Sequence, residues 1–257
     1  MTCLATLLPP ACASAGRAVH LRDDRADPGP GPGLRVPVSH LVEHLPLLLA
    51  AMRQHYDGDN ARALLSQWSK YYFSLVVPAA VAAALVLKRP LYMPWEDSVL
   101  LLRNGMPQAL YLPTDALGGV SDEPAVRYAS LFVEHLAPLV EALAGAVRMA
   151  PRVLWSNVGH TLEYALSTAL ESSQAQLDQS FLLNRAEFFD TGLPNPLWQV
   201  IRYLKPDNPE LPDPLRVRRT CCLRYLLPGE KMLCSSCPML LTLPAPAVAE
   251  QMRLLRT

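Results

Sequence analysis

Four of the six cysteines of this chain lie within the seventeen residues from Cys221 to Cys237. They form an adjacent pair, Cys221 and Cys222, and a C-x₂-C pair, Cys234 and Cys237. Four thiols so close in sequence are typical of a metal or iron–sulfur site. The fold therefore has to bring the two pairs to one place.

The eleven residues between the pairs, LRYLLPGEKML, contain a turn signal. The alternation from Leu223 to Leu227 predicts a short strand, and Pro228-Gly229 is a strong turn dipeptide. If the chain reverses there, Leu223 comes opposite Cys234. We therefore expect a cysteine-rich hairpin, with the two pairs at its open end. Its register stays open, because Pro-Gly fits a type II turn better than the primed turns of tight hairpins.

Three chemistries fit these thiols to different degrees. A disulfide framework needs an oxidising compartment, and adjacent cysteines are poor partners because their Cα atoms lie only about 3.8 Å apart. Structural zinc sites usually combine two C-x₂₋₄-C pairs, and here one pair is collapsed to Cys-Cys. A two-iron cluster accommodates this step more easily, since neighbouring ligands can bind different irons. The spacing favours [2Fe–2S] over zinc and leaves zinc and unmetallated thiols open.

The rest of the chain predicts a helical body. Hydrophobic residues make up 51% of the sequence and charged residues 18%, which is not the composition of a disordered chain. The net charge is zero, so there is no basic footprint for nucleic acid. Asn104-Gly105 between two apolar runs predicts a hairpin of strands 98–103 and 108–112. The fold class expected is mainly α with a small β component (α+β).

Capping residues, prolines and apolar spacing set the other expected elements. These are helices over about 39–55, 60–88, 123–149, 151–172 and 174–188, with kinks at Pro78 and Pro138, and one strand within 198–204.

We expect four segments along the chain. They are a poorly patterned N-terminal segment with a Pro/Gly-rich linker (1–37), a mainly helical body (38–205), an iron–sulfur-binding segment (206–240) and a short tail (241–257).

The N-terminus does not predict secretion, although Ala13-Ser14-Ala15 resembles a cleavage site. No basic residue precedes Arg17 within the segment, and Pro9-Pro10 interrupt a short apolar stretch. The longest apolar run, Phe73 to Leu87, has fifteen residues and an internal proline, which is short for a membrane span. We expect it to be a buried core helix.

The cysteine segment also carries a resemblance. The pattern RxxCCLRYxLPG followed by C-x₂-C-P resembles the C-terminal signature of FhuF-type ferric-siderophore reductases. Upstream, WSKYYFSLVVPA (Trp68–Ala79) and LWSNVG (Leu154–Gly159) look similar as well, so the resemblance covers most of residues 38–240. The family separates its cysteine pairs by about ten residues, and this chain by eleven. The residues that carry the signature are Arg218 or Arg219, Cys221, Cys222, Leu223, Arg224, Tyr225, Pro228, Gly229, Cys234, Cys237 and Pro238.

The resemblance implies a [2Fe–2S] cluster held by Cys221, Cys222, Cys234 and Cys237. It also implies an oxidoreductase acting on metal ions, a siderophore-iron reductase. Such an enzyme passes one electron through the cluster to a cytoplasmic Fe(III)-siderophore, expected to be of the hydroxamate type, and releases Fe(II). No catalytic residue beyond the cluster is expected.

The expected partners are the ferric siderophore and an electron donor such as a ferredoxin or an NAD(P)H-dependent reductase. The sequence has no dinucleotide fingerprint of its own. We expect no nucleic acid and, at most, a peripheral association with the inner membrane. The alternative is a non-enzymatic iron–sulfur or structural zinc module for iron sensing or cluster delivery.

Basic residues near the cysteines are candidates for electrostatic tuning. An oxidised cluster with four thiolates carries a formal charge of about −2. Arg218, Arg219 and Arg224 lie close in sequence and would stabilise the more negative reduced form. The competing interpretation is an ordinary solvated basic face.

Two further patterns have a structural and a functional interpretation. His40-Leu41-Val42-Glu43-His44 matches the inverted zinc-peptidase motif H-x-x-E-H, but chance matches are common and we expect an ordinary amphipathic helix. Trp68, Tyr71 and Tyr72 would form either a substrate-facing aromatic wall or, as helical spacing favours, part of the core.

Overall fold

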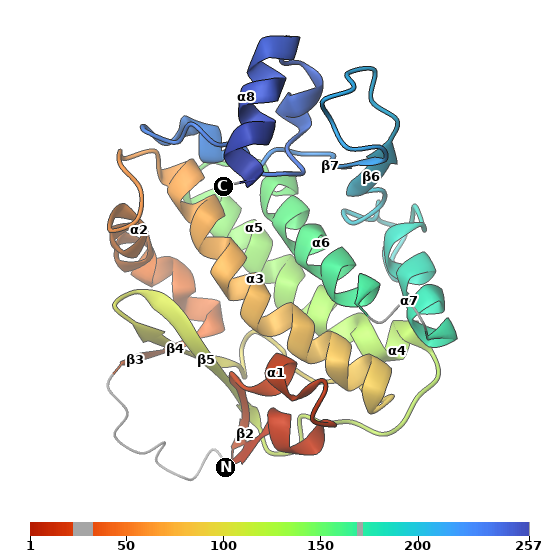
Figure 1. Ribbon diagram of the computed structural model, residues 1–257. Helices are drawn as coiled ribbons and strands as arrows, with labels where there is room; N and C mark the ends of the chain where they lie inside the picture. The colour runs from red at the N-terminus through yellow and green to blue at the C-terminus, as the bar shows by residue number, and fades with distance from the viewer. Residues whose placement is uncertain (23–32, 169–171, 257) are drawn as a thin grey trace.

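The computed structural model describes residues 1–22, 33–168 and 172–256, and it confirms a mainly α fold with a small β component (Figure 1). The long helices lie side by side, with a sheet at one edge and the C-terminal segment across one end. The helices are α1 (Ala13–Gly16), α2 (Leu45–Arg53), α3 (Ala61–Val86), α4 (Pro124–Ala129), α5 (Ala137–Ala146), α6 (Arg152–Ser167), α7 (Ser173–Leu183) and α8 (Ala245–Arg256). The strands are β1 (Thr2–Cys3), β2 (Val19–Arg22), β3 (Leu34–Pro37), β4 (Val99–Arg103), β5 (Met106–Pro113), β6 (Ile201–Leu204) and β7 (Leu215–Arg218).

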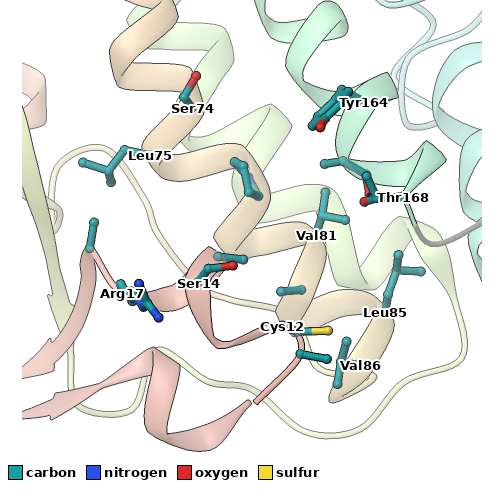
Figure 2. Close-up of a pocket in the computed structure, with 16 residues that line it drawn as sticks. Cys12, Ser14, Arg17, Ser74, Leu75, Val81, Leu85, Val86, Tyr164 and Thr168 are labelled. Carbon is teal, nitrogen blue, oxygen red and sulfur yellow. Dashed lines mark hydrogen bonds between the residues drawn. The ribbon is translucent and has the colours of Figure 1, made fainter. Parts of the chain in front are cut away.

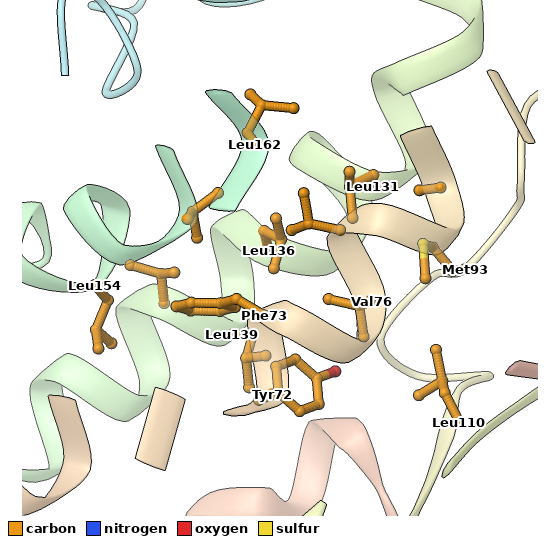
Figure 3. Close-up of a cluster of buried hydrophobic side chains, with 14 of the residues drawn as sticks. Tyr72, Phe73, Val76, Met93, Leu110, Leu131, Leu136, Leu139, Leu154 and Leu162 are labelled. Carbon is orange, nitrogen blue, oxygen red and sulfur yellow. The ribbon is translucent and has the colours of Figure 1, made fainter. Parts of the chain in front are cut away.

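Helix α3 runs through the centre of the molecule. It begins next to the predicted residue 60 and is capped by Asn60, whose side chain accepts a hydrogen bond from the Ala63 N–H at 3.1 Å. The helix continues through Pro78 to Val86 without a break. It packs against α6, and the aromatic and aliphatic side chains of both helices meet those of α5 in the main core (Figure 3).

The helix predicted over 123–149 consists of three consecutive parts. Between α4 and α5, residues Ser130–Leu136 form a π-helical segment. Pro138 is the second residue after this segment, and its missing N–H leaves the Glu134 carbonyl, four residues earlier, without its α-helical donor. The irregularity predicted at Pro138 therefore takes the form of a locally widened helix.

The predicted Asn104-Gly105 hairpin is confirmed. Asn104 and Gly105 both have positive φ (51° and 79°), as a primed turn requires. The register shifts between Leu101 and Leu102, at the level of Pro107, which cannot donate to the ladder. The five-stranded sheet has the order β1-β2-β5-β4-β3 and is antiparallel except for the parallel β2–β5 pair.

The described part of the N-terminal segment joins the body. Strand β2 pairs with β5, and Leu4 and Val19 are fully buried. Ten residues of the predicted linker, 23–32, lie outside the described residues. Sequence patterning was weak here because the elements are only two to four residues long.

The C-terminal part has a small core of its own. The strand predicted within 198–204 is β6, which pairs with β7, a strand that the sequence did not predict. Helix α8 occupies the predicted tail. It covers a second cluster of buried side chains, formed by Leu211, Leu215, Val217, Cys237, Leu240, Val248 and Met252.

Two helical stretches, α3 and Pro124–Ala146, are long and apolar enough to cross a membrane. In their most apolar windows, 67% and 50% of the residues are buried inside the protein. The α3 value agrees with the buried core helix predicted for Phe73 to Leu87.

A buried histidine predicts a pH dependence of stability. His135 shares hydrogen bonds with the Tyr72 hydroxyl (2.5 Å) and the Met93 carbonyl (2.6 Å), and burial lowers its pKa from 6.5 to about 4. The unfolded chain binds this proton below pH 6.5, so stability is present above pH 6.5 and falls as the pH drops towards 4. We expect a loss of about 3 kcal/mol over this window. Urea titrations should show a flatter pH profile for His135→Gln, and an unchanged slope would contradict this assignment.

A buried ion pair predicts a large mutational effect. Arg127 and Asp178 are paired at 2.6 Å with fully buried side chains, and the Tyr128 hydroxyl also donates to Asp178 at 2.9 Å. Asp178→Ala should lower the free energy of unfolding by about 3–5 kcal/mol, because it leaves a buried guanidinium unpaired. Asp122→Ala, which removes the exposed Lys88–Asp122 pair, is the control and should have a much smaller effect. Similar losses in the two variants would rule out this account.

Candidate metal centre

The structure brings the four C-terminal thiols together. The sulfurs of Cys221 and Cys237 lie 4.0 Å apart. Cys222 interacts with Cys221 and Cys234, and Cys237 interacts with the same two, so contacts run around a closed ring of four side chains. All four are free cysteines. The predicted convergence of the two pairs is confirmed.

The backbone between the pairs differs from the prediction. Leu223 adopts a left-handed conformation (φ 61°), and residues Arg224–Leu226 form a 3₁₀ turn. The strand predicted at Leu223 to Leu227 is therefore wrong, although the chain does turn at Pro228-Gly229, where Gly229 has φ 80°. The hairpin is a looped reversal, and the described residues between Arg219 and Cys237 contain no strand.

The adjacent cysteines Cys221 and Cys222 both reach the ring. In an extended chain, neighbouring side chains point to opposite sides. Both thiols nevertheless approach the second pair here, directly before the chain turns at the left-handed Leu223. Adjacency alone thus does not exclude zinc.

The C-x₂-C pair is held from two sides. The Arg218 N–H of β7 donates to the Ser236 carbonyl at 2.9 Å, and the Cys237 N–H donates to the Cys234 carbonyl at 2.9 Å. From α8, Gln251 accepts a hydrogen bond from the Leu233 N–H at 2.8 Å. Its amide nitrogen donates to the carbonyl of Lys231, also at 2.8 Å. Helix α8 thus fixes the segment that leads into the second cysteine pair.

The Cys-Cys pair is held by the helical body. The carbonyl of Cys222 accepts hydrogen bonds from the Ser66 hydroxyl (2.8 Å) and the Gln67 amide (2.9 Å), both on α3. From α6, the Ser156 hydroxyl donates to the Thr220 carbonyl at 2.7 Å. Two helices therefore fix the backbone on either side of Cys221.

Asn157 of α6 connects these anchors. Its amide nitrogen donates to the Ser66 carbonyl (2.9 Å) and the Ser69 hydroxyl (3.0 Å), while its oxygen accepts from the Arg218 guanidinium at 2.6 Å. All four side chains are buried. Apart from Arg218 Nε, for which the described residues offer no partner, these polar groups are hydrogen-bonded, so the joint between body and cysteine segment is specific in orientation.

The four thiols lie close enough together to hold one metal centre. Four thiolates bind either a [2Fe–2S] cluster, with two ligands on each iron, or a single zinc ion. Both centres need four converging thiolates, which this ring supplies.

Comparison with known proteins decides the family. A family model described as "Ferric iron reductase FhuF-like transporter" matches residues 66–209, more than half of the chain. The chain belongs to the FhuF family. A second model, "FhuF 2Fe-2S C-terminal domain", matches residues 218–238, which include all four clustered cysteines. This match confirms the predicted [2Fe–2S] cofactor.

One curated relative of this FhuF-family chain is the "Ferric siderophore reductase" of Escherichia coli (strain K12). The two sequences are 28% identical over 182 residues, which cover 68% of this chain and 65% of the relative. The match thus spans just under two thirds of the relative's own length.

The thiols of this FhuF-family site differ in electrostatic environment. Contacts from Cys221 and Cys234 lower the pKa of Cys222, and the nearby charges of Lys70 and Arg218 add to this effect. The same kind of contact, from Cys221 and Cys234, raises the pKa of Cys237, as does burial.

Lys70 is a residue that sequence reasoning missed. Its ammonium lies 3.3 Å from the Cys222 sulfur and donates to the Gln67 side chain at 2.5 Å. Lys70 lies 152 positions before Cys222 in sequence. Lys70 lies in WSKYYF, one of the segments that carried the family resemblance. Spacing along the sequence, however, does not reveal a contact between distant residues.

The three predicted tuning arginines occupy different environments. Arg218 is buried and bonded to Asn157, close enough to the ring to affect Cys222. Arg219 is exposed and lies over the Trp198 ring at 5.5 Å. Arg224 is paired with Glu230 at 2.5 Å, so its charge is largely neutralised. Tuning by these residues stays a prediction, and Lys70 joins them.

The remaining candidates are structural in this fold. His40 and His44 lie in a 3₁₀ helix, Val38–His44, where residues four apart do not share a face, so the H-x-x-E-H pattern does not form a zinc site. Trp68 and Tyr72 are fully buried in the core. Tyr71 alone of that trio is exposed.

The histidine and glutamate of α6 are likewise structural. Glu163 pairs with Arg216 of β7 at 2.5 Å and accepts a hydrogen bond from Tyr203. Burial, with the nearby charges of Arg218 and Arg216, lowers the pKa of His160 to about 3. His160 is therefore neutral at physiological pH.

Lys70 should influence the reduction potential of the bound cluster. Replacing Lys70 by methionine removes a cation 3.3 Å from a ligand sulfur, which destabilises the more negative reduced state. A loss of about 1 kcal/mol corresponds to roughly 40 mV for a one-electron couple, so the potential should become more negative by about that amount. Protein-film voltammetry measures it directly. Lys88→Met, just beyond the far end of the same helix, is the matched control, and equal potentials in the two variants would refute the assignment.

Proposed function

We propose that this chain is a ferric-siderophore reductase. It reduces an Fe(III)-siderophore of the hydroxamate type by one electron, so that iron is released as Fe(II). The observation that supports this most directly is the ring of four thiols within the segment matched by the 2Fe-2S domain. The relative's name, a ferric siderophore reductase, agrees with the proposal.

The proposed chemistry needs an electron route rather than an acid–base pair. A siderophore holds hard Fe³⁺ through oxygen ligands, and a single added electron weakens the complex because Fe²⁺ is a softer ion. When bound, the [2Fe–2S] cluster supplies electrons one at a time. Cys221, Cys222, Cys234 and Cys237 are the residues we propose as its ligands.

The four thiols differ in burial, so the ring has a buried side and an accessible side. Cys222 and Cys237 are buried against the body and the small C-terminal core, whereas Cys221 and Cys234 are half-buried. Lys70 and Arg218 approach from the body side. The accessible side of the ring, with Cys221 and Cys234, is therefore the side we assign to electron exchange.

An external protein supplies the electrons in this proposal. The sequence has no nucleotide fingerprint, so the donor would be a ferredoxin or an NAD(P)H-dependent reductase. We place the reaction in the cytoplasm, with at most a peripheral association with the inner membrane.

We also propose that successive segments of the chain have different roles. Residues 38–205 form the helical body, with the described part of residues 1–37 added to its sheet. Residues 206–240 form the iron–sulfur segment, and the predicted tail, 241–257, serves that segment. The support for this last point is the small core under α8, which buries Cys237 together with Val248 and Met252.

Substitution of the cysteines tests the cofactor. Protein purified without oxygen should be brown, with visible charge-transfer absorption and an EPR signal after reduction. Cys222→Ser should lose most of the iron, whereas Cys12→Ser, a free cysteine outside the ring, should keep it. Colourless wild-type protein with stoichiometric zinc and no iron would overturn the assignment.

A reoxidation assay tests the activity separately. Reduced, desalted protein is mixed with a ferric hydroxamate complex, and a chelator traps the ferrous iron. We expect rapid return of the oxidised absorption and one Fe(II) per cluster. If several siderophores fail to reoxidise a properly loaded protein, the non-enzymatic role in iron sensing or cluster delivery is favoured.

A further inference from the structure

A second feature lies beside the ring, a surface pocket of about 540 Å³. Its wall includes the start of α6, the loop before β6 and the chain that leads into the first cysteine pair. Cys221 is part of this wall, and it is the one ring cysteine among the lining residues. The residues that matter here are Arg152, Asn195, Trp198, Val200, Arg219 and Cys221.

The pocket is positively charged. Two guanidinium groups, Arg152 and Arg219, line it, and among the residues that the structure describes no acidic side chain does. Arg219 lies over the Trp198 ring, which orients its planar group. In the described parts of the chain, neither arginine takes part in a salt bridge. Both charges are therefore available to a bound molecule.

The pocket floor is preformed. The Arg219 N–H donates to the Val200 carbonyl at 2.8 Å, which ties the loop to the cysteine segment. Asn195 is held by backbone groups, donating to the Leu182 and Arg185 carbonyls at 2.9 Å each. A Cβ atom at Gly159 would lie 2.2 Å from a Val200 methyl group, so the glycine lets α6 approach this loop closely.

Other cavities are less suited to bind a ligand that takes up an electron at the ring. A groove of about 530 Å³ between α1, α3 and α6 is mainly apolar, and no ring cysteine lines it (Figure 2). A smaller cavity of about 180 Å³ is lined by Lys70 and Tyr71 but by none of the four thiols. A compact ligand fits the size of the pocket beside Cys221, because small-molecule sites usually measure about 300–1,000 Å³.

We propose that the ferric complex binds in this pocket, between Arg152, Trp198 and Arg219, next to Cys221. The inference rests on the proposed reductase function and names the binding site for it. A reduced cluster held by the four cysteines would supply the one electron that turns Fe³⁺ into Fe²⁺, and it would itself be left oxidised. No atom is transferred in this step.

The charge of the pocket explains why it would favour reduction. A ferric complex with three hydroxamates is neutral and gains one negative charge when its iron is reduced. Two guanidinium groups stabilise the reduced complex more than the oxidised one, so their interaction strengthens along the reaction. Their N–H groups match the oxygen atoms at the surface of such a complex. The Trp198 ring offers its face to the carbon skeleton.

Binding is tested without redox chemistry by the gallium(III) complex of the same trihydroxamate, which has the same charge and nearly the same size as the ferric one. Calorimetry on the oxidised, cluster-loaded protein gives its Kd. Arg152→Gln/Arg219→Gln should raise the Kd at least tenfold, and Trp198→Ala should raise it as well. Arg202→Gln, an exposed arginine on β6 outside the pocket, is the matched control and should bind as the wild type does.

Reoxidation by the ferric complex gives the second readout. The double variant should show an at least tenfold lower second-order rate constant at wild-type cluster content, and its reduction potential is measured separately so that the rates are compared at equal driving force. If the wild type is reoxidised but the double variant matches it in rate and in gallium binding, the pocket assignment is overturned while the reductase function stands. If the loaded wild type neither binds the gallium complex nor is reoxidised, both proposals fail.

Discussion

The site depends on a buried polar joint between the helical body and the cysteine segment. Ser66 and Gln67 of α3 bind the Cys222 carbonyl, and Asn157 of α6 links Ser66 to Arg218. These groups are buried and bonded to one another, so breaking any one contact leaves a polar group without a partner inside the protein. A large helical body is required because the cysteine segment alone offers only a small core.

This joint also explains how the helical body places positive charge beside the ring. Docking the Cys222 backbone on α3 places Lys70, one turn further along the helix, beside the Cys222 sulfur. At the neighbouring Cys221, the ring borders the pocket with Arg152 and Arg219. Positive charge therefore lies near two of the thiols, around a group whose own charge is negative.

Local signals in the sequence predicted much of the fold and the membership of the ring. Capping at Asn60, the Asn104-Gly105 turn and the apolar stripes of α3 and α6 act over a few residues, so they can be read directly. The conformation of Leu223 could not be predicted, because a left-handed leucine is held by its surroundings and opposes its own preference. Lys70 was missed for a related reason: its role comes from a contact between distant parts of the chain.

The looped reversal between the cysteine pairs has a consequence for the length of this segment. The ring is fixed at its two ends, by the body at Cys222 and by β7 and α8 around Cys234 and Cys237. Between these anchors the chain leaves the ring, and Tyr225 and Leu226 are exposed at the surface. An inserted or deleted residue can be absorbed in this exposed arc without moving a thiol. A gap of eleven residues is thus compatible with the ring geometry of relatives whose gap is about ten.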